Sequence, residues 1–252
     1  MTSINGNLKG YYYEEGYLRT SSREYNVQQL SNKFIHLTND AIQKKADDYG
    51  KFECGNKLSY ADFQNYLDRA HADKNISFER DLLPQMKKLT LDCMKAAWGK
   101  MDPYRRMNSF EIFGLDFMFD SEFKPYLIEV NTNPSLDLPS PNLCRLIPSM
   151  LENSFRIAVD PLFPPNEGFA QRKTTFAESI PLNRYELIFC EDVDGPYLEE
   201  LAKKQPEIIE FDEDELSSAC GSENNEPLEA LEAADAFLIK TDADDAADLL
   251  IE

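Results

Sequence analysis

Asp116 and Glu129 are acidic residues in a stretch of the sequence that is otherwise rich in Phe, Leu, Ile and Val. Residues 113–131 predict a β-hairpin, and because successive strand residues point to opposite faces, Glu129 shares a face with Asn131. A turn centred between residues 122 and 123 places Asp116 directly across from Glu129. Opposed like charges destabilise a strand pair, and carboxylates among apolar side chains are costly unless they are compensated. Since Mg²⁺ takes one or two carboxylates together with substrate phosphates, the pattern indicates a metal–phosphate site.

The alternative interpretation of these residues is that they are ordinary acids on the solvent-exposed face of a half-buried sheet. The spacing alone leaves both interpretations open. A metal-dependent hydrolase is disfavoured, because the sequence contains no His-containing metal cluster and no evident pair of nucleophile and base.

The charge of the chain is unevenly distributed. The 252 residues carry a formal net charge of -20, with 20 Lys and Arg against 22 Asp and Glu in residues 1–165, and 6 against 24 in residues 166–252. We therefore expect a near-neutral globular domain over residues 1–165 and an acidic extension over residues 166–252, largely disordered beyond about Pro206. Nucleic acid is not expected as a ligand, because neutralising its phosphates needs an excess of basic side chains.

The cysteines and the apolar segments bear on the compartment. The five cysteines are scattered, odd in number and without C-x-x-C spacing, which is typical of reduced thiols in an intracellular protein and disfavours a zinc site. No apolar run reaches the roughly 18 residues of a membrane-spanning helix, and the N-terminus lacks the features of a signal peptide. We expect a soluble, cytoplasmic protein with no membrane partner.

The elements around the predicted hairpin give a mixed α+β pattern. Asn5-Gly6 is a strong two-residue hairpin signal, and Leu8–Leu18 predicts strand, turn and strand. Only four residues precede that turn, too few for a proper partner strand, so the chain is expected to begin inside a sheet; a flexible N-terminal loop is the alternative. Further along, hydrophobic spacing predicts helices over 60–71, 78–98, 143–159 and 197–204, a strand over 185–189, and marginal helices over 228–238 and 246–251.

Five sequence blocks together resemble one family, the tubulin–tyrosine ligases, which are ATP-grasp enzymes. The blocks are Leu-Arg19-Thr-Ser-Ser, Phe34-Ile-His-Leu-Thr38-Asn39, Tyr49-Gly-Lys-Phe, Phe113-Gly-Leu-Asp116-Phe, and Leu127-Ile-Glu129-Val-Asn131-Thr-Asn-Pro. They cover roughly residues 2–165 in the family's order. The resemblance implies the C-terminal part of an ATP-grasp fold, an antiparallel sheet with flanking helices.

The resemblance also implies a role for each matching residue. The implied Mg²⁺ ligands are Asp116, Glu129 and Asn131. The implied residues of the nucleotide and amino-acid site are Thr38 and Asn39, with Ile128, which faces away from the metal side, as an apolar contact to the adenine. Arg19 resembles the catalytic arginine near the transferred phosphate, where a permanent cation with planar donors suits developing negative charge.

The activity that the resemblance implies is ATP- and Mg²⁺-dependent ligation of glutamate, glycine or tyrosine to tubulin through an acyl phosphate. The expected partners are the acidic tail of tubulin and a free amino acid, and the chain is expected to act as a monomer on the microtubule cytoskeleton, in the cytoplasm or the cilium. The block Asn131-Thr-Asn-Pro-Ser-Leu looks more like the glutamylating and glycylating members (a polyglutamylase-like pattern) than the founding tyrosine ligase.

The sequence departs from the family pattern at its start. The strand with Lys, Asp and Arg that the family carries upstream of the Arg19 block has no counterpart, so the sequence predicts a member without its N-terminal half. Such a chain is expected to bind ATP weakly and to have little or no ligase activity alone. The alternative function is that of a non-catalytic fragment or pseudoenzyme that binds tubulin. The acidic extension is expected to be a solvated tail, or alternatively an autoinhibitory mimic of the substrate.

Overall fold

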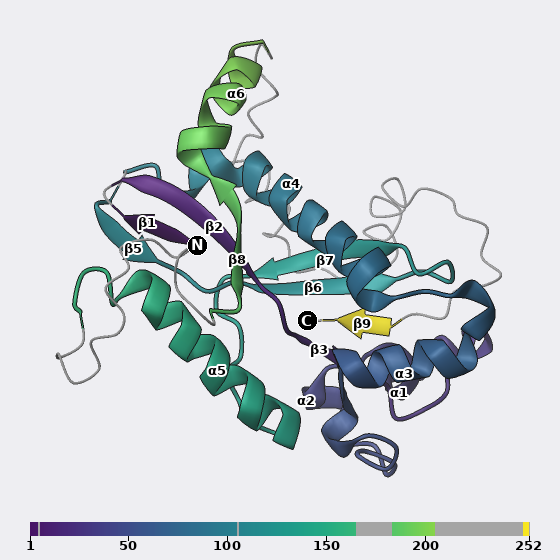
Figure 1. Cartoon of the computed structure of the whole chain (residues 1–252). Helices are drawn as coiled ribbons and strands as arrows, with labels where there is room; N and C mark the ends of the chain where they lie inside the picture. The colour runs from purple at the N-terminus through teal and green to yellow at the C-terminus, as the bar shows by residue number, and fades with distance from the viewer. Residues whose placement is uncertain (5, 105, 165–182, 205–248, 252) are drawn as a thin grey trace, which may run out of the picture. The chain divides into compact units, whose positions relative to one another are not determined.

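The computed structural model describes the chain except for residues 5, 105, 165–182, 205–248 and 252 (Figure 1). The chain divides into one unit of Met1–Gly195 with Ala247–Glu252 and a second unit of Pro196–Ala246. Both sheets lie in the first unit. The expected disorder beyond Pro206 and the marginal helix over 228–238 lie outside the described residues.

The first sheet has the strand order β5(Asn108–Phe110), β1(Thr2–Ile4), β2(Asn7–Tyr13), β8(Tyr185–Cys190), and all its pairings are antiparallel. The hairpin predicted at Asn5-Gly6 is confirmed, because Ile4 pairs with Asn7 and Gly6 has a φ of 78°. The expectation that four residues are too few for a partner strand was wrong. Three residues suffice here because β1 is hydrogen-bonded on both sides, to β2 and to β5.

The second sheet has the order β4(Lys57–Ser59), β3(Tyr17–Arg19), β9(Leu249–Ile251), β6(Gly114–Phe119), β7(Pro125–Asn131), also antiparallel throughout. Figure 1 shows β9 between β3 and β6. The marginal helix predicted over 246–251 was therefore wrong. A helix of so few residues is unstable by itself, whereas backbone groups of β3 and β6 pair with β9 from both sides.

The hairpin of β6 and β7 has the register that the sequence predicts at its acidic residues. Asp116 pairs with Glu129, and Gly114 pairs with Asn131. Nearer the turn the register shifts, because Phe117 pairs with Leu127 and leaves Ile128 as the extra residue of a β-bulge. The turn is accordingly centred on residue 122, and the bulge restores the register at Asp116.

The helices of the chain match most of the predicted ones. The α-helices are α1(Lys33–His36), α2(Asp40–Gln43), α3(Tyr60–Ala70), α4(Leu83–Met101), α5(Pro141–Ala158) and α6(Glu191–Lys204). Short turns of other helix types are η1(Val27–Gln29), η2(Cys54–Asn56), η3(Ala72–Lys74) and the π-helical η4(Phe78–Leu82). Helix α6 begins at Glu191, earlier than the predicted Tyr197, since the Glu191 side chain is held by the backbone N–H of Leu8 and the indole of Trp98.

One hydrophobic core fixes the strands that carry the charged residues. It consists of Leu18, Phe63, Leu67, Phe78, Leu82, Met86, Phe117, Phe119 and Phe123. Burying each such side chain contributes about 1.5–3 kcal/mol. Because neighbours in a strand point to opposite faces, the burial of Leu18 and Phe117 directs Arg19 and Asp116 to the other side of the sheet.

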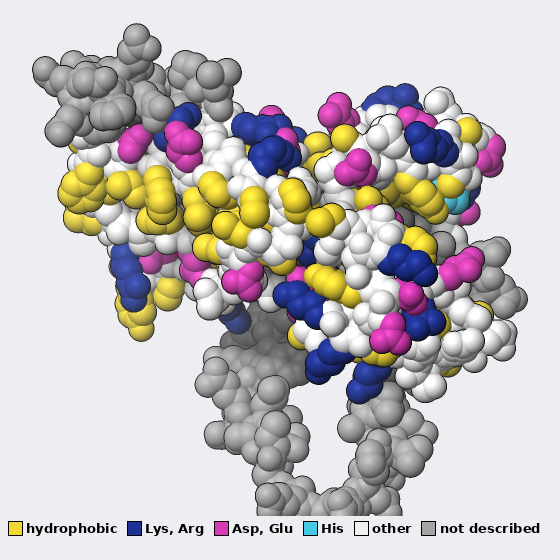
Figure 2. Space-filling model, turned by 90° about the horizontal axis from the view of Figure 1, so that it is seen from below, with side chains coloured by type: hydrophobic (Ala, Val, Ile, Leu, Met, Phe, Trp, Pro, Cys, Tyr) yellow, Lys and Arg dark blue, Asp and Glu magenta, His cyan; other side chains and the backbone are white. Residues whose placement is uncertain are grey.

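The surface of the described chain mixes charges and apolar side chains. On the face in Figure 2, hydrophobic side chains gather in a band, and Lys and Arg side chains are interspersed with Asp and Glu rather than collected into one patch. Among the described residues, no helix is both long and apolar enough to cross a membrane.

Candidate functional site

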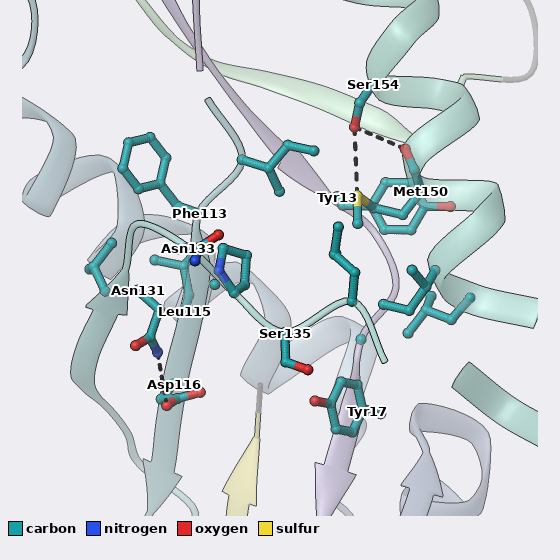
Figure 3. Close-up of a pocket in the computed structure, with 18 of the residues that line it drawn as sticks. Tyr13, Tyr17, Phe113, Leu115, Asp116, Asn131, Asn133, Ser135, Met150 and Ser154 are labelled. Carbon is teal, nitrogen blue, oxygen red and sulfur yellow. Dashed lines mark hydrogen bonds between the residues drawn. The ribbon is translucent and has the colours of Figure 1, made fainter. Parts of the chain in front are cut away.

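A cavity of about 670 Å³ lies in the first unit, and residues of both sheets, α2, α4 and α5 line it. One end is apolar, with Tyr13, Phe113 and Met150 among its walls (Figure 3). The other end is charged and contains Arg19 and the acidic residues of the hairpin. The cavity thus joins a hydrophobic chamber to a group of ionisable side chains.

The three predicted metal ligands lie together at the charged end. The amide Nδ2 of Asn131 donates hydrogen bonds to Asp116 Oδ2 at 3.3 Å and to Glu129 Oε1 at 3.2 Å. Figure 3 shows Asn131 directed at Asp116. The strand register therefore does bring Asp116, Glu129 and Asn131 to one face, as the sequence predicts.

Arg19 comes to the same place from β3. Its Nη2 lies 3.4 Å from Asp116 Oδ2, and both side chains are almost fully buried, at 11% and 6% exposed. Burial lowers the pKa of Arg19, and the nearby carboxylates of Asp116, Asp40 and Glu129 oppose that shift. The guanidinium remains a cation, because its pKa starts well above neutrality.

The two opposed carboxyl groups have different proton affinities. Burial, followed by the proximity of Glu129, raises the pKa of Asp116 to about 6, against the opposing effect of Arg19. Hydrogen bonds from Asp116 and then Asn131 lower the pKa of Glu129. In mildly acidic solution Asp116 therefore holds a proton and Glu129 carries the negative charge.

The residues fit a hard divalent cation. Asp116 Oδ1 is buried and has no hydrogen-bond partner in the described part of the chain, so one acceptor oxygen remains unsatisfied. Two carboxylates and a carboxamide are oxygen donors of the kind that Mg²⁺ binds, and an amide can present either its N–H group or its oxygen. Within the described ranges, no three His, Cys, Asp or Glu side chains are grouped so that they could hold a metal ion. A site with three protein ligands at this place therefore needs the Asn131 carboxamide together with Asp116 and Glu129.

The Thr38-Asn39 block lies beside this end of the cavity, between α1 and α2. Asn39 lines the cavity, whereas Thr38 is buried behind it and its hydroxyl has no hydrogen-bond partner among the residues described. Buried Gln43 supports the segment, since its Nε2 donates to Leu37 O at 2.5 Å and its Oε1 accepts from Ser22 N at 2.8 Å.

Like Thr38, Ile128 is a predicted site residue that does not line the cavity. It is the extra residue of the bulge, 54% exposed, and the cavity is lined by its neighbours Glu129 and Val130 instead.

The sequence analysis missed a second charged group in the cavity wall. Lys57 Nζ lies 2.9 Å from Asp40 Oδ1, and Lys44 Nζ lies 3.7 Å from Asp40 Oδ2. All three side chains line the cavity. The spacing of Asp40 and Lys44, four apart, was a signal for their pairing on a helix, but no local pattern points to Lys57.

Comparison with known proteins gives a consistent result. Residues 1–167 match the model of the tubulin-tyrosine ligase family. The chain is similar to tubulin glycylase 3A of Drosophila melanogaster (35% identical over 175 residues, 68% of this chain and 17% of the relative). It is also similar to tubulin glycylase 3B of Tetrahymena thermophila (31% over 150 residues, 60% and 12%) and to the human protein monoglycylase TTLL8 (33% over 154 residues, 60% and 18%). The chain therefore spans less than a fifth of the length of these relatives.

Proposed function

Because the chain belongs to the tubulin-tyrosine ligase family, as its five sequence blocks predicted, we propose that its cavity belongs to an ATP-dependent ligase that joins an amino acid to tubulin. The observation that carries the proposal is the convergence of Asp116, Glu129 and Asn131 beside the buried Arg19. These residues come from two separate segments, both inside the part that matches the family model.

The amino acid that we propose is glycine rather than glutamate or tyrosine. The names of the similar proteins from three organisms support this choice, because each describes a glycylase or monoglycylase. The proposed acceptor is a carboxylate in the acidic tail of tubulin, which places the protein at the cytoskeleton, where it is proposed to act as a monomer.

The residues at the charged end have distinct proposed tasks. Asp116, Glu129 and Asn131 would hold Mg²⁺, and Mg²⁺–ATP bound there would supply the phosphoryl group that activates the acceptor carboxylate as an acyl phosphate. Arg19 holds a permanent positive charge and N–H donors beside that position, which stabilises the negative charge that develops during phosphoryl transfer.

The other residues predicted to contact the nucleotide and the amino acid are proposed to do so here as well. Asn39 can offer its amide to a ligand in the cavity, and Thr38 supports that segment from behind. Ile128 would meet the adenine from the exposed side of β7.

The proposal is tested by incubating the chain with tubulin, ATP, Mg²⁺ and isotopically labelled glycine. We expect labelled glycine to be joined to tubulin only when ATP and the tubulin tails are present. Glu129→Gln should lower this labelling roughly hundredfold, because it removes a charged metal ligand. Glu122→Gln is the matched control, since Glu122 lies in the same hairpin but is exposed and pairs only with Lys74 in the part described.

Two results would count against this proposal. Equal labelling by the wild type and Glu129→Gln would refute the role of the carboxylate pair. Binding of tubulin without any label, at all concentrations of ATP, would instead support the non-catalytic tubulin-binding module.

A further inference from the structure

Two lysines pair with one carboxylate, Asp40, in the cavity wall near Arg19. Asp40 bonds Lys57 through one oxygen and approaches Lys44 through the other. The charges of both Asp116 and Asp40 act on Arg19, so Arg19 lies near this group as well as near the proposed metal ligands. The wall therefore carries both signs of charge within a few ångströms.

Lys57 is held in a fixed position and still has hydrogen-bonding capacity. Its side chain is only 3% exposed, and its ammonium lies 5.4 Å from the centre of the Tyr17 ring. An ammonium has three N–H donors, and Asp40 is the one hydrogen-bond acceptor found for Lys57 in the described residues. Burial lowers the pKa of Lys57, and the Asp40 hydrogen bond partly opposes this shift, as expected for a cation with too few acceptors.

Lys44 differs from Lys57 in its freedom to move. Its side chain is about half exposed, at 53%, and its 3.7 Å approach to Asp40 is longer than a hydrogen bond. A ligand can therefore draw the Lys44 ammonium away from Asp40 at little cost, because exposed ion pairs of this kind contribute little to stability.

The group has more positive than negative charge, with or without a cation at the proposed metal site. Arg19 is paired with Asp116, so Lys44 and Lys57 face Asp40 alone. The wall would bind an anionic group at the two lysines while Asp40 remained available to a cationic group. A zwitterion with a carboxylate and an ammonium close together matches both requirements, whereas a phosphate matches only the first.

We propose that Asp40, Lys44 and Lys57 form the subsite for the free amino acid of the reaction, a role that rests on the proposed function. Lys57 and Lys44 bind the α-carboxylate, and Asp40 binds the α-ammonium. The group lines the same cavity as the proposed metal ligands, so the amino acid and the activated carboxylate would share that cavity.

The test is a titration of the ¹⁵N-labelled full chain with glycine, without ATP or divalent cations, followed by amide chemical shifts. We expect shifts at Asn39, Asp40 and Lys57, and weaker binding of the single-charge probes acetate and ethylamine. Lys57→Met, which keeps the stem against Tyr17, and Asp40→Asn should each weaken glycine binding roughly tenfold or more, as loss of a charged hydrogen bond does. Lys51→Met is the matched control, because Lys51 is exposed, pairs with Asp48 and lies outside the cavity lining.

Several results would overturn the subsite. The first is that the wild type does not bind glycine, and the second is that Lys57→Met binds glycine as well as the wild type does. The third is that inorganic phosphate binds more tightly than glycine and still does so in Asp40→Asn. If Lys57→Met fails to fold by circular dichroism, the double variant with Asp40→Asn removes both charges and must show the same loss. Glu129→Gln should leave glycine binding unchanged, so failure of the metal site and failure of this subsite are distinguishable.

Discussion

Asp116 gives the sharpest prediction about stability, because its buried carboxyl group has a pKa raised from 3.8 to about 6. A raised folded-state pKa means that the stabilising effect is present below the unfolded pKa of 3.8 and is lost as pH rises through 6. At 1.36 kcal/mol per pKa unit, ionising Asp116 costs the folded chain at most about 3 kcal/mol. The Asp116→Asn variant cannot ionise at this position, so its stability relative to the wild type should rise by about 1–1.5 kcal/mol between pH 5 and pH 8, the rest of the effect falling between pH 3.8 and pH 5.

The neighbouring Glu129 does not cancel this effect. Its pKa is lowered from 4.5, so its stabilising contribution is present above 4.5 and is lost only as pH falls further, outside the range from pH 5 to pH 8. The assay is urea unfolding followed by circular dichroism at several pH values in metal-free buffer. Asp73→Asn, at an exposed position, is the control. If Asp116→Asn and Asp73→Asn both stay parallel to the wild type at every pH, the inference that Asp116 is a strained, protonatable carboxyl group is refuted.

Two further predictions follow from the same contacts. At pH values below 6, the Mg²⁺ affinity measured by isothermal titration calorimetry should decrease by up to about tenfold per pH unit, because the cation must displace the proton of Asp116. An unchanged affinity down to pH 5 would contradict this prediction. Gln43→Leu should lower the free energy of unfolding by roughly 1–3 kcal/mol, because it leaves the buried Ser22 amide and the Leu37 carbonyl without their side-chain partner. A loss below 0.5 kcal/mol in urea unfolding would show that this network is dispensable.

The parts of the site that lie close in sequence could be predicted from sequence. Strand periodicity and a single turn determine that Asp116 faces Glu129, and both residues lie within one hairpin. The helices α3, α4 and α5 have apolar faces with regular spacing, which is a local signal. The bulge at Ile128 escaped prediction because it depends on how the turn packs, with Phe123 buried at a positive φ of 61°.

The parts that depend on tertiary packing could not be predicted in the same way. Lys57 reaches Asp40 only because β4 pairs with β3, which brings the Lys57 side chain to the first residue of α2. Strand β9 pairs with β3 and β6 across more than 100 residues of sequence, and three residues carry no pattern that reveals such partners. The resemblance to the family predicted that Arg19 lies near the reacting phosphate and its metal, whereas residue spacing alone gave no such indication.

The central claim is that Asp116, Glu129 and Asn131 together hold a divalent cation, and paramagnetic broadening by Mn²⁺ tests it most directly. In spectra of the ¹⁵N-labelled chain, substoichiometric Mn²⁺ should first broaden the amides of Asp116, Glu129 and Asn131, and Glu129→Gln but not Glu122→Gln should abolish that broadening. Broadening confined to the acidic residues after position 205, with these three amides still sharp, would contradict the claim.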